Sequence, residues 1–447
     1  MVVTPIDTGD KDIADAPWRA TQKHGFMTRP SLPATIGDIP QKLDHDIVNW
    51  SGSLTVAPDR RVEPRSEEEV SEVVRFATRH GQRVRPIGSA HSSTPIIASD
   101  DIVVSLDRLT GVVGHDAERR VATVLPGTGL ADLGSQLADV GLALENFGDV
   151  DYQTIAGAVG TGTHGTGETL GNLSSMVLGG RLVTGGGDVL PFGHDAGAEA
   201  ERDLTRAAQV SLGTLGIMTS LTLRVRPSYD LHRYNVITHI EWVLDHFDDL
   251  AARYRHVDFY WYPRSDLAQL RILDEPGRLD GLEVPGRLHR EEVGPSYEIL
   301  PNTQELRFEE MEYMLPRALG LEAFRRARER IKERHRARVA WRVLVRTVAA
   351  DDAMLSPSHR RPTMTIALLH NASLPYEHYF GDMEPLFLDH GGRPHWGKKH
   401  SRTAPDLAQL YPDWEDFAAT RRRLDPHGVF RNDYLDTLLE AGANDGG

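Results

Sequence analysis

Apolar residues recur at helical spacing over 66–80, which predicts an amphipathic helix in this stretch. Ser66 followed by Glu69 is the pattern of a capping box, and Gly81 stands where a glycine commonly ends a helix. The segment RVRPI, at 83–87, is predicted to form a short strand. Regular structure is therefore expected to begin with a helix followed by a strand.

A second unit has a strand at 121–125 and a helix with leucines at helical spacing from Leu130 to Leu137. The segment RLVTGGGDVLPF, at 181–192, places glycines between two apolar runs and predicts a hairpin. LTLRVRP, at 221–227, alternates apolar and polar residues, and its proline ends the strand. We therefore place a domain boundary near residue 228.

From 229 to about 390 the pattern changes to aromatic-rich strands such as HVDFYWYP. A charged helix is predicted at 320–338, and further strands at 340–348 and 363–370. Strands and helices that follow one another in separate runs predict an α+β fold.

Composition excludes several functions. Asp plus Glu outnumber Lys plus Arg by 65 to 50 in the 447 residues, and the formal net charge of −15 gives no general attraction for nucleic acid or anionic lipid. The chain has no cysteine, which excludes disulfides, thiolate catalysis and cysteine-ligated metals. The histidines include no H-E-x-x-H motif, so no metal site is predicted.

The sequence also predicts a soluble, cytoplasmic protein, with a monomer favoured. No apolar run is long enough to span a membrane, and the first residues lack the layout of a signal peptide. Residues 1–44 are polar and are expected to form an arm, and the tail from Glu440 is expected to be disordered.

Small residues gather in three segments: GSAHSS at 88–93, PGTG at 126–129 and the Gly- and Thr-rich run 155–167. The last contains a formal G-x-G-x-x-G, but the residues after it are a poor helix start, so a Rossmann dinucleotide site is not indicated. Backbone N–H groups in such loops can form an anion nest, and the three together could enclose a pyrophosphate and a planar ring. The alternative is that these glycines are ordinary turns.

Five segments occur in an order and spacing that resemble the vanillyl-alcohol-oxidase type of flavoprotein. Within this type they are similar to the sugar-1,4-lactone oxidases and alditol oxidase, over about 49–435. The segments are IGSAHSS, ENFGDVDYQTIAGAVGTGTHGTG, SLGTLGIMTSLTL, RPHWGKKH and RRRLDPHGVFRNDYL.

The resemblance implies an α+β fold with a PCMH-type FAD-binding domain of two subdomains and an α+β cap over the substrate. On this basis we expect an N-terminal arm at 1–44, the FAD-binding domain at 45–228 and the cap at 229–390. The segment 391–447 is expected to return to the FAD domain.

The resemblance also implies the residues that hold FAD. His91 matches the histidine that bonds covalently to the flavin 8α carbon, although on its own a loop histidine is more often a hydrogen-bonding residue. Family members often have glycine where this chain has Ala90. The full expected set is Pro86, Ile87, Gly88, Ser89, Ala90, His91, Ser92, Gly127, Gly148, Asp149, Thr154, Gly157, Ala158, Val159, Gly160, Thr161, Thr163, His164, Gly216, Ile217 and His395.

Lys398 matches the active-site lysine of these oxidases and Arg346 the arginine of their substrate-binding strand. A fixed cation would stabilise the negative charge that develops when a hydride passes from an alcohol carbon to flavin N5. Adjacent lysines are usually surface features, so Lys399 is expected to point away. A structural salt bridge is the alternative for Arg346.

Two positions depart from the family pattern. The family's Glu-x-Arg has Leu344 in place of its glutamate, and Gly148 is followed by Asp149 where alditol oxidase has serine. Asp149 could accept substrate hydroxyls in place of the lost carboxylate, or act as the base. The small Gly148 leaves room for O2 beside the flavin, which predicts an oxidase that makes hydrogen peroxide.

The expected function is therefore an FAD-dependent oxidase of a polyol, sugar or sugar-1,4-lactone. A dehydrogenase of the same fold with another electron acceptor is the first alternative. A carbohydrate-binding flavoprotein that has lost catalysis is the second, and the loss of the family glutamate is its main support.

Overall fold

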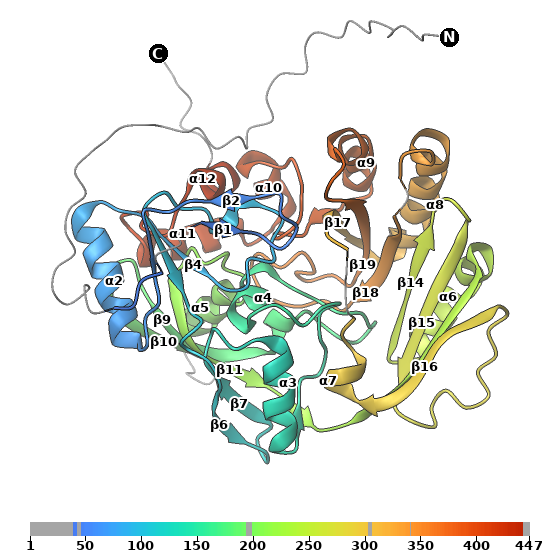
Figure 1. Ribbon diagram of the computed structural model, residues 1–447, viewed down its shortest axis with the longest axis horizontal. Helices are drawn as coiled ribbons and strands as arrows, with labels where there is room; N and C mark the ends of the chain where they lie inside the picture. The colour runs from blue at the N-terminus through green and yellow to red at the C-terminus, as the bar shows by residue number, and fades with distance from the viewer. Residues whose placement is uncertain (1–38, 43–45, 194–198, 303–305, 340, 441–447) are drawn as a thin grey trace, which may run out of the picture.

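The computed structural model describes residues 39–42, 46–193, 199–302, 306–339 and 341–440. The expected N-terminal arm falls largely outside these residues, as does the tail after Glu440. In the described ranges, a three-stranded sheet, a five-stranded sheet, two short strand pairs and most helices form one part of the molecule, and a larger sheet stands beside them (Figure 1). The α+β prediction is confirmed.

A small parallel sheet begins the first part. The predicted helix is α2 (Glu67–His80), whose first turn is capped by Ser66 Oγ accepting from the Glu69 N–H at 3.3 Å. The Glu69 carboxylate accepts from the Arg65 N–H instead of closing the capping box, and Gly81 ends the helix at φ +63°. The strand order is β3-β5-β4, with β3 at Arg60–Val62, β5 at Ile102–Ser105 and β4 at Val84–Ile87.

An antiparallel sheet completes this part, and its β10–β9 pair is the predicted hairpin. The order is β10 (Val189–Gly193), β9 (Val177–Val183), β11 (Ile217–Arg224), β7 (Val121–Val124) and β6 (Val112–Asp116). Its helices are α3 (Leu130–Asp139), α4 (Ile155–Thr161) and α5 (Glu199–Gln209), with 3₁₀ turns at Pro95–Ile97 and Leu173–Met176. Two short pairs are β1 (Ile47–Val48) with β2 (Thr55–Val56), and β8 (Leu142–Ala143) with β12 (Arg226–Pro227).

The larger sheet is antiparallel and begins two residues after Ser228. Its order is β16 (Arg287–Pro295), β13 (Asp230–His239), β15 (Leu267–Asp274), β14 (His256–Tyr262), β18 (Val343–Val348), β19 (Thr363–Asn371), β17 (Phe308–Pro316) and β20 (Arg393–Pro394). Its helices are α6 (Ile240–Arg253), α7 (Ser296–Ile299), α8 (Gly320–Arg330) and α9 (Glu377–Asp389), with a 3₁₀ turn at Arg317–Leu319 and a π-helical turn at Ile331–His335.

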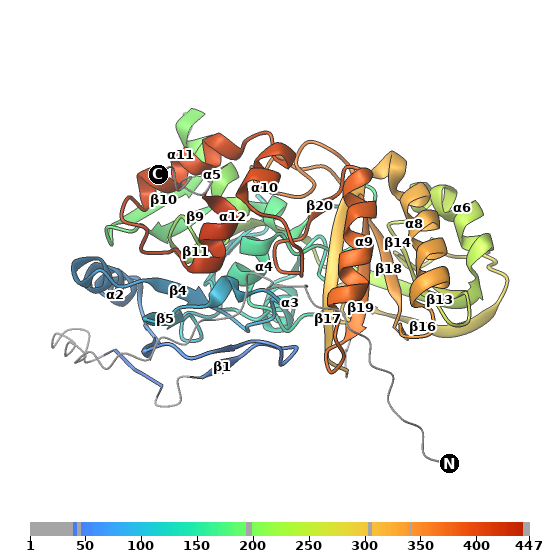
Figure 2. The ribbon, with the colours of Figure 1, turned by 90° about the horizontal axis from the view of Figure 1, so that it is seen from above.

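The two faces of the larger sheet differ in chemistry. One face packs its apolar residues against α6, α8 and α9 in a single core that includes Phe259, Val345 and Ile366. Figure 2 shows α6 and α8 on the side of this sheet away from the first part. Because side chains alternate along a strand, the residues between these apolar ones point to the opposite face. That face carries many charged side chains and looks toward the first part.

The C-terminal segment packs on the first part through α10 (Ala404–Leu410), α11 (Trp414–Leu424) and α12 (Asp433–Leu439). Leu407, Trp414 and Leu435 lie in the same apolar core as Ile87 of β4. Before these helices, β20 adds to the edge of the larger sheet beside β17. The segment therefore contacts both parts, and its turn at 395–399 lies between them.

Candidate active site

A cavity lies in the first part, between the loop after β4, helix α4 and the loop 211–216. It encloses about 810 Å³ of empty space, part of it open to solvent. Backbone and small side chains dominate its lining. The lining residues are Arg85, Pro86, Ile87, Gly88, Ser89, Ala90, His91, Ser92, Ile96, Ile97, Leu106, Gln153, Thr154, Ala156, Gly157, Gly160, Thr161, Ser211, Leu212, Gly213, Gly216 and Met218.

Glycines shape this cavity in two ways. A Cβ at Gly88 would overlap Thr154 Oγ1, so glycine is what lets the loop after β4 approach α4. A Cβ at Gly160 would meet no described atom within 4 Å, because this glycine faces the cavity. Small residues thus leave a cradle that side chains would otherwise fill, and this cradle fits the FAD expected from the sequence.

His91 lies on the wall of the cavity. Its Nδ1 is buried and makes no hydrogen bond to the residues that the structure describes. Burial, with a smaller effect of the Lys398 charge, lowers the pKa of His91 to about 3, so the imidazole is neutral at neutral pH. Trp50 packs against it with ring centroids 4.9 Å apart. A neutral imidazole with a free nitrogen has the chemistry of a nucleophile.

Ala90 adopts φ +51°, in the left-handed region that favours glycine. The glycine that family members often carry here therefore has a conformational reason. The methyl group of Ala90 is accommodated, but the backbone at this position is strained in this chain.

Arg85 is a buried cation beside the cavity. Its guanidinium donates to the backbone carbonyls of Ile96 at 2.9 Å, Gly213 at 3.0 Å, Phe430 at 2.5 Å and Leu212 at 2.6 Å. Burial lowers the pKa of Arg85 to about 9. The side chain therefore ties segments from four parts of the chain together at the floor of the cavity.

Twelve of the residues expected to hold FAD line the cavity: Pro86, Ile87, Gly88, Ser89, Ala90, His91, Ser92, Thr154, Gly157, Gly160, Thr161 and Gly216. Gly127, Ala158, Val159 and Ile217 pack behind them: Gly127 is pressed against Leu106, and the other three are fully buried. Gly148, Asp149, Thr163, His164 and His395 lie outside the cavity lining.

The expectation of an open loop over 155–167 is wrong in its first half. Residues 155–161 form α4, so N–H groups such as that of Ala158 are bonded within the helix. The PGTG turn does not line the cavity either. It supports the start of α4 through the Ile155 N–H, which donates to the Thr128 carbonyl at 2.9 Å.

The charged face of the larger sheet carries a lysine–carboxylate pair. Lys398 Nζ contacts Glu310 Oε2, and the Glu310 side chain is 6% exposed. Lys399 instead lies 3.4 Å from Glu309 and over the ring of Tyr376. Neighbouring residues on β17 point to opposite faces, so the two lysines have different surroundings although they are adjacent in sequence.

The turn that carries Lys398 also contacts the cavity loop. The Ser93 N–H donates to the Gly397 carbonyl at 2.9 Å, and Trp50 and Phe308 pack edge to face with centroids 5.0 Å apart. The Lys398 charge also contributes, after burial, to the lowered pKa of His91. The cavity and the charged face are therefore adjacent parts of one site.

Two buried carboxylates on β17 are in contrasting electrostatic states. Burial raises the pKa of Glu310, and the negative charge of Glu312 adds to the effect although Lys398 opposes it. Burial would raise the pKa of Glu312 as well, but the charge of Arg346 and contact with His164 hold it well below its ordinary value. Glu310 is thus the better proton acceptor and Glu312 a permanent anion.

Arg346 is held by Glu312. Its Nη2 lies 2.5 Å from Glu312 Oε1, and its Nη1 donates to the His164 carbonyl at 3.1 Å. His164, Glu312 and His395 form the one cluster of possible metal ligands found among the described residues, with ligand atoms within 4.8 Å of one another. The guanidinium occupies the same carboxylate oxygen that faces His164 at 3.2 Å, which disfavours a metal cation there.

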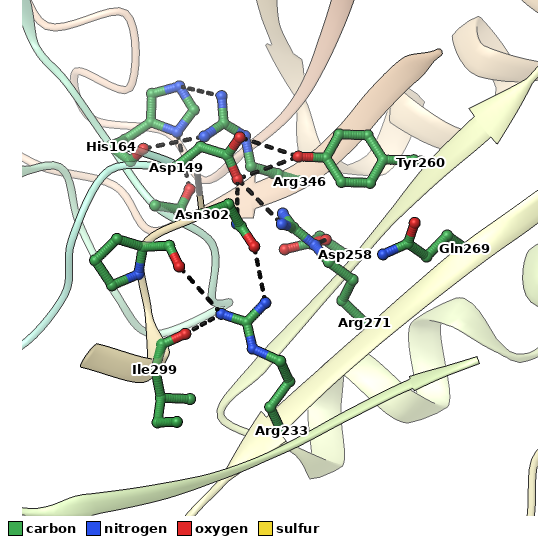
Figure 3. Close-up of polar contacts among 12 residues, drawn as sticks. Asp149, His164, Arg233, Asp258, Tyr260, Gln269, Arg271, Ile299, Asn302 and Arg346 are labelled. Carbon is green, nitrogen blue, oxygen red and sulfur yellow. Dashed lines mark hydrogen bonds and ion pairs between the residues drawn. The ribbon is translucent and has the colours of Figure 1, made fainter. Parts of the chain in front are cut away.

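Asp149 joins its loop to the larger sheet (Figure 3). Its carboxylate accepts from Asn302 Nδ2 at 2.8 Å, Tyr260 Oη at 3.0 Å and Arg271 Nη1 at 3.0 Å. Arg271 also contacts Asp258. Burial would raise the pKa of Asp149, but Arg271 and Arg346 hold it well below its ordinary value. A carboxylate with these donors is a weak base and has little capacity left for substrate hydroxyls.

Glu310, Glu312 and Arg271 were not identified from the sequence. The signal for two of them was present in RFEEMEYMLP, where acidic residues alternate with apolar ones at strand spacing. It was not decisive, because such alternation is also typical of a strand with one face in water. Arg271 gives no local signal, since its partners come from distant segments.

In the described residues, no helix combines the length and apolar character needed to cross a membrane.

Comparison with known families gives two matches. Residues 58–193 match the FAD binding domain, and residues 221–278 and 279–438 match D-arabinono-1,4-lactone oxidase. The L-gulono-1,4-lactone dehydrogenase of Mycobacterium tuberculosis (strain H37Rv) is 36% identical over 428 residues, covering 88% of this chain and 98% of that protein.

Two further relatives and one structure extend the comparison. The alditol oxidase of a Streptomyces species is 30% identical over 88% of this chain and 99% of its own length. The L-gulonolactone oxidase of Bos taurus is 29% identical over 88% and 97%. The crystal structure of cholesterol oxidase from B. sterolicum superposes with a TM-score of 0.78, covering 93% of this chain and 100% of that chain, at 17% identity. This last likeness concerns the fold alone.

Proposed function

The chain belongs to the D-arabinono-1,4-lactone oxidase family of vanillyl-alcohol-oxidase-type FAD oxidoreductases, and from this premise we propose that it oxidises an alcohol carbon of a small polyol, sugar or sugar-1,4-lactone. The observation that carries the proposal is the pair of Lys398 and Glu310 on the charged face, beside the cavity wall at His91.

The proposed division of labour follows the two parts of the site. Residues 45–228, with 391–447, would hold FAD in the cavity, and 229–390 would present the substrate. This division is supported by the cradle around Gly88 and Gly160 and by the charged face of the larger sheet. Bound FAD would supply the acceptor for the hydride that leaves the carbinol carbon.

Glu310 and Lys398 have matched tasks in this scheme. Oxidation of an alcohol to a carbonyl releases a proton from the hydroxyl oxygen, and the Glu310 carboxylate, with its raised pKa, is suited to accept it. The Lys398 ammonium, within contact of Glu310, would stabilise the negative charge that develops on the substrate oxygen. Arg346 is proposed to bind a substrate or flavin oxygen through the donors that Glu312 leaves free.

Asp149 is proposed as a positioning residue. Its contacts with Tyr260, Arg271 and Asn302 fix the loop that carries Gly148 against the larger sheet. The role of base proposed from the sequence passes to Glu310, because the pKa of Asp149 is held low and that of Glu310 is raised.

Covalent attachment of FAD through His91 is supported by the free Nδ1 and by the neutral state of the imidazole. Tethering a flavin raises its redox potential, which suits the oxidation of an unactivated alcohol.

We propose O2 as the electron acceptor, with hydrogen peroxide as the product. The support is the small Gly148 and the relatives named oxidases. The dehydrogenase alternative is favoured by the relative named dehydrogenase and by the place of Gly148, where a Cβ would lie 2.9 Å from Thr163 Cγ2, so packing alone accounts for a glycine.

One experiment tests both the proposed oxidation of an alcohol and the proposed electron acceptor. The purified holoenzyme is mixed anaerobically with L-gulono-1,4-lactone, D-arabinono-1,4-lactone or xylitol, and the flavin absorbance is followed before and after air is admitted. Bleaching by at least one compound is expected, with rapid return of the colour in air. Bleaching that persists in air would favour the dehydrogenase. A flavin that no alcohol or lactone bleaches would contradict the function and leave the inactive carbohydrate binder.

A further inference from the structure

Two consecutive residues in the turn between β1 and β2, Asn49 and Trp50, hold the backbone on both sides of His91. The Trp50 N–H donates to the Ala90 carbonyl at 2.9 Å, and Asn49 Nδ2 donates to the Ser92 carbonyl at 3.1 Å. These carbonyls belong to the residues immediately before and after His91. The pair Asn49 and Trp50, the His91 clamp, therefore fixes the backbone of this histidine from both ends.

The turn that carries the clamp is itself closed by hydrogen bonds. Asn49 is 2% exposed, its Oδ1 accepts from the Leu54 N–H at 3.0 Å, and its own N–H donates to the Leu54 carbonyl at 3.0 Å. Its Nδ2 also donates to Ser51 Oγ at 3.0 Å. Because the amide donates through Nδ2 and accepts through Oδ1, only one orientation satisfies all of these partners. The turn is thus a preorganised support for the loop that carries His91.

The ring of Trp50 adds a side-chain contact to these backbone bonds. It packs against the His91 imidazole with centroids 4.9 Å apart, and it meets Phe308 of β17 edge to face at 5.0 Å. The indole is therefore supported by the larger sheet while its own N–H holds the loop of the first part. The clamp restricts the orientation of the imidazole as well as the path of the backbone.

The clamp acts on a strained part of the loop. Ala90 has φ +51°, and the Trp50 N–H bonds to the carbonyl of this residue. Beyond His91, the Ser93 N–H donates to the Gly397 carbonyl at 2.9 Å. Backbone strain persists only where the surroundings enforce it, and it is concentrated at functional positions. Enforced strain next to His91 therefore indicates that the placement of this histidine matters beyond folding.

We propose that Asn49 and Trp50 are positioning residues for the covalent attachment of FAD, and that they hold the His91 imidazole in the orientation that bond formation requires. This inference rests on the proposed attachment and names the residues on which it depends. In that step a C–N bond forms between the imidazole and the flavin 8α carbon, while an N–H and a C–H bond break. The two protons and two electrons released reduce O2, the acceptor proposed above, to hydrogen peroxide.

Attachment and binding of FAD should respond differently to loss of the clamp. Bond formation is sensitive to position, because a displacement of about 1 Å can lower the rate by about 100-fold. Binding depends on the cavity lining, and neither Asn49 nor Trp50 is among the described residues that line the cavity. Loss of the clamp should therefore slow attachment and leave FAD bound.

The test measures attachment and binding separately. The full-length protein is produced in riboflavin-starved cells and incubated with FAD in air. Flavin that stays with the protein through gel filtration gives the total bound, and flavin in the acid pellet gives the attached part. Trp50→Ala and Asn49→Asp are each expected to slow the appearance of flavin in the pellet by about 10-fold or more, with total flavin per chain unchanged.

The two variants remove different contacts. Trp50→Ala removes the ring from the imidazole and keeps the backbone N–H that holds Ala90. Asn49→Asp keeps the size of the side chain and the acceptor for the Leu54 N–H, but it places an oxygen in place of the donor to the Ser92 carbonyl.

Two further variants serve as matched controls. Val48→Ala changes the same hairpin at a side chain that is 53% exposed, and it should leave the rate of attachment unchanged. Trp50→Phe keeps an aromatic ring for the imidazole, and its rate should stay within about threefold of the unchanged chain.

The outcomes separate this inference from the claims on which it rests. Attachment at the unchanged rate in both Trp50→Ala and Asn49→Asp would overturn the clamp and leave attachment through His91 standing. A loss of total flavin that matches the loss of attached flavin would show a structural role and would also overturn it. Flavin that stays in the supernatant of the unchanged chain would overturn attachment itself, while the bleaching experiment still tests the oxidoreductase. If Trp50→Ala does not fold, Asn49→Asp decides.

Discussion

The cavity proposed to hold FAD and the charged face of the larger sheet adjoin, but they are built in different ways. The cavity is made of backbone and small side chains from three local segments, and among the described residues that line it Arg85 is the only one with a permanent charge. The charged face is made of long side chains, including Arg271, Arg346, Glu310 and Glu312, from strands distant in sequence.

The cavity provides a shape that can hold a ligand, and the charged face provides groups that can react. A cavity lined by backbone can hold a large cofactor without a dedicated charge for each contact, and it depends on glycine and on a few buried ties. A face of paired charges can move protons and stabilise developing charge, and it depends on each side chain having its partner. Substitutions in the cavity should therefore impair cofactor binding and stability, whereas substitutions on the charged face should impair turnover.

Loss of charge at Lys398 should give the largest effect. Lys398→Met is expected to lower kcat/KM by about 1000-fold, and Glu310→Gln by about 100-fold, because one removes the fixed cation and the other the proton acceptor. Flavin content should be unchanged in both. Steady-state kinetics on flavin-loaded enzyme measures the effect.

Lys399→Met is the control for this prediction, because Lys399 contacts Glu309 and Tyr376 on the other face. Its kcat/KM should stay within about threefold, although the unpaired Glu309 lowers stability. Equal losses of kcat/KM in the Lys398 and Lys399 variants would show that the charged face takes no part in the reaction.

Arg85→Met should give the largest loss of stability in the cavity. The change removes a donor from four backbone carbonyls, three of them in buried hydrogen bonds and one in a partly buried one, so the free energy of unfolding should fall by about 3 kcal/mol or more. Denaturant unfolding measures it. Arg83→Met, which removes surface ion pairs with Asp433 and Asp436, should cost less than about 1 kcal/mol. Similar losses in the two variants would contradict the role of Arg85 as a tie.

The pH dependence of stability tests the burial of His256 in the larger sheet. Burial, aided by the charge of Arg255, lowers its pKa to about 3, against about 6.5 in an unfolded chain. Between these values the unfolded state binds a proton that the folded state does not, so stability falls as pH decreases through this window. The loss from His256 should reach about 3 kcal/mol at pH 4.

His256→Gln should therefore flatten the fall in unfolding free energy between pH 7 and pH 4. His115→Gln, at an exposed position on β6, is the control and should leave the fall unchanged. A slope that His256→Gln does not alter would show that other groups carry the acid sensitivity.

Ala90→Gly should give the smallest effect, with the opposite sign. Relief of the left-handed backbone should raise the unfolding free energy by about 0.5–1 kcal/mol. Ala98→Gly, where φ is −65°, should lower it by a similar amount. Thermal or denaturant unfolding distinguishes them, and a loss of stability in both variants would contradict strain at Ala90.

Features that depend on local sequence could be predicted, whereas features that depend on contacts between distant segments could not. The helix begun by Ser66, the hairpin at Gly187 and the loop around His91 are local, so spacing and small residues were enough to predict them. The start of α4 was misjudged because isolated glycines do not reveal whether the surrounding contacts favour a helix or a loop.

The charged face could not be predicted in the same way. Glu312 meets Arg346 across the intervening strand β19, and Asp149 meets Arg271 from a different part of the fold. Such pairs depend on strand order and register, which one sequence does not specify. Asp149 was assigned as an acceptor or base because its partners lie in other segments and could not be identified from its own.

The central claim is that FAD occupies the cavity and is joined to His91. Its most direct test is the absorption spectrum of the purified protein, repeated on pellet and supernatant after acid precipitation, for the unchanged chain and for His91→Ala. We expect yellow colour in the pellet of the unchanged chain and in the supernatant of the variant. Yellow colour in both supernatants would remove the covalent bond, and no flavin in either protein, even after incubation with FAD, would contradict the central claim.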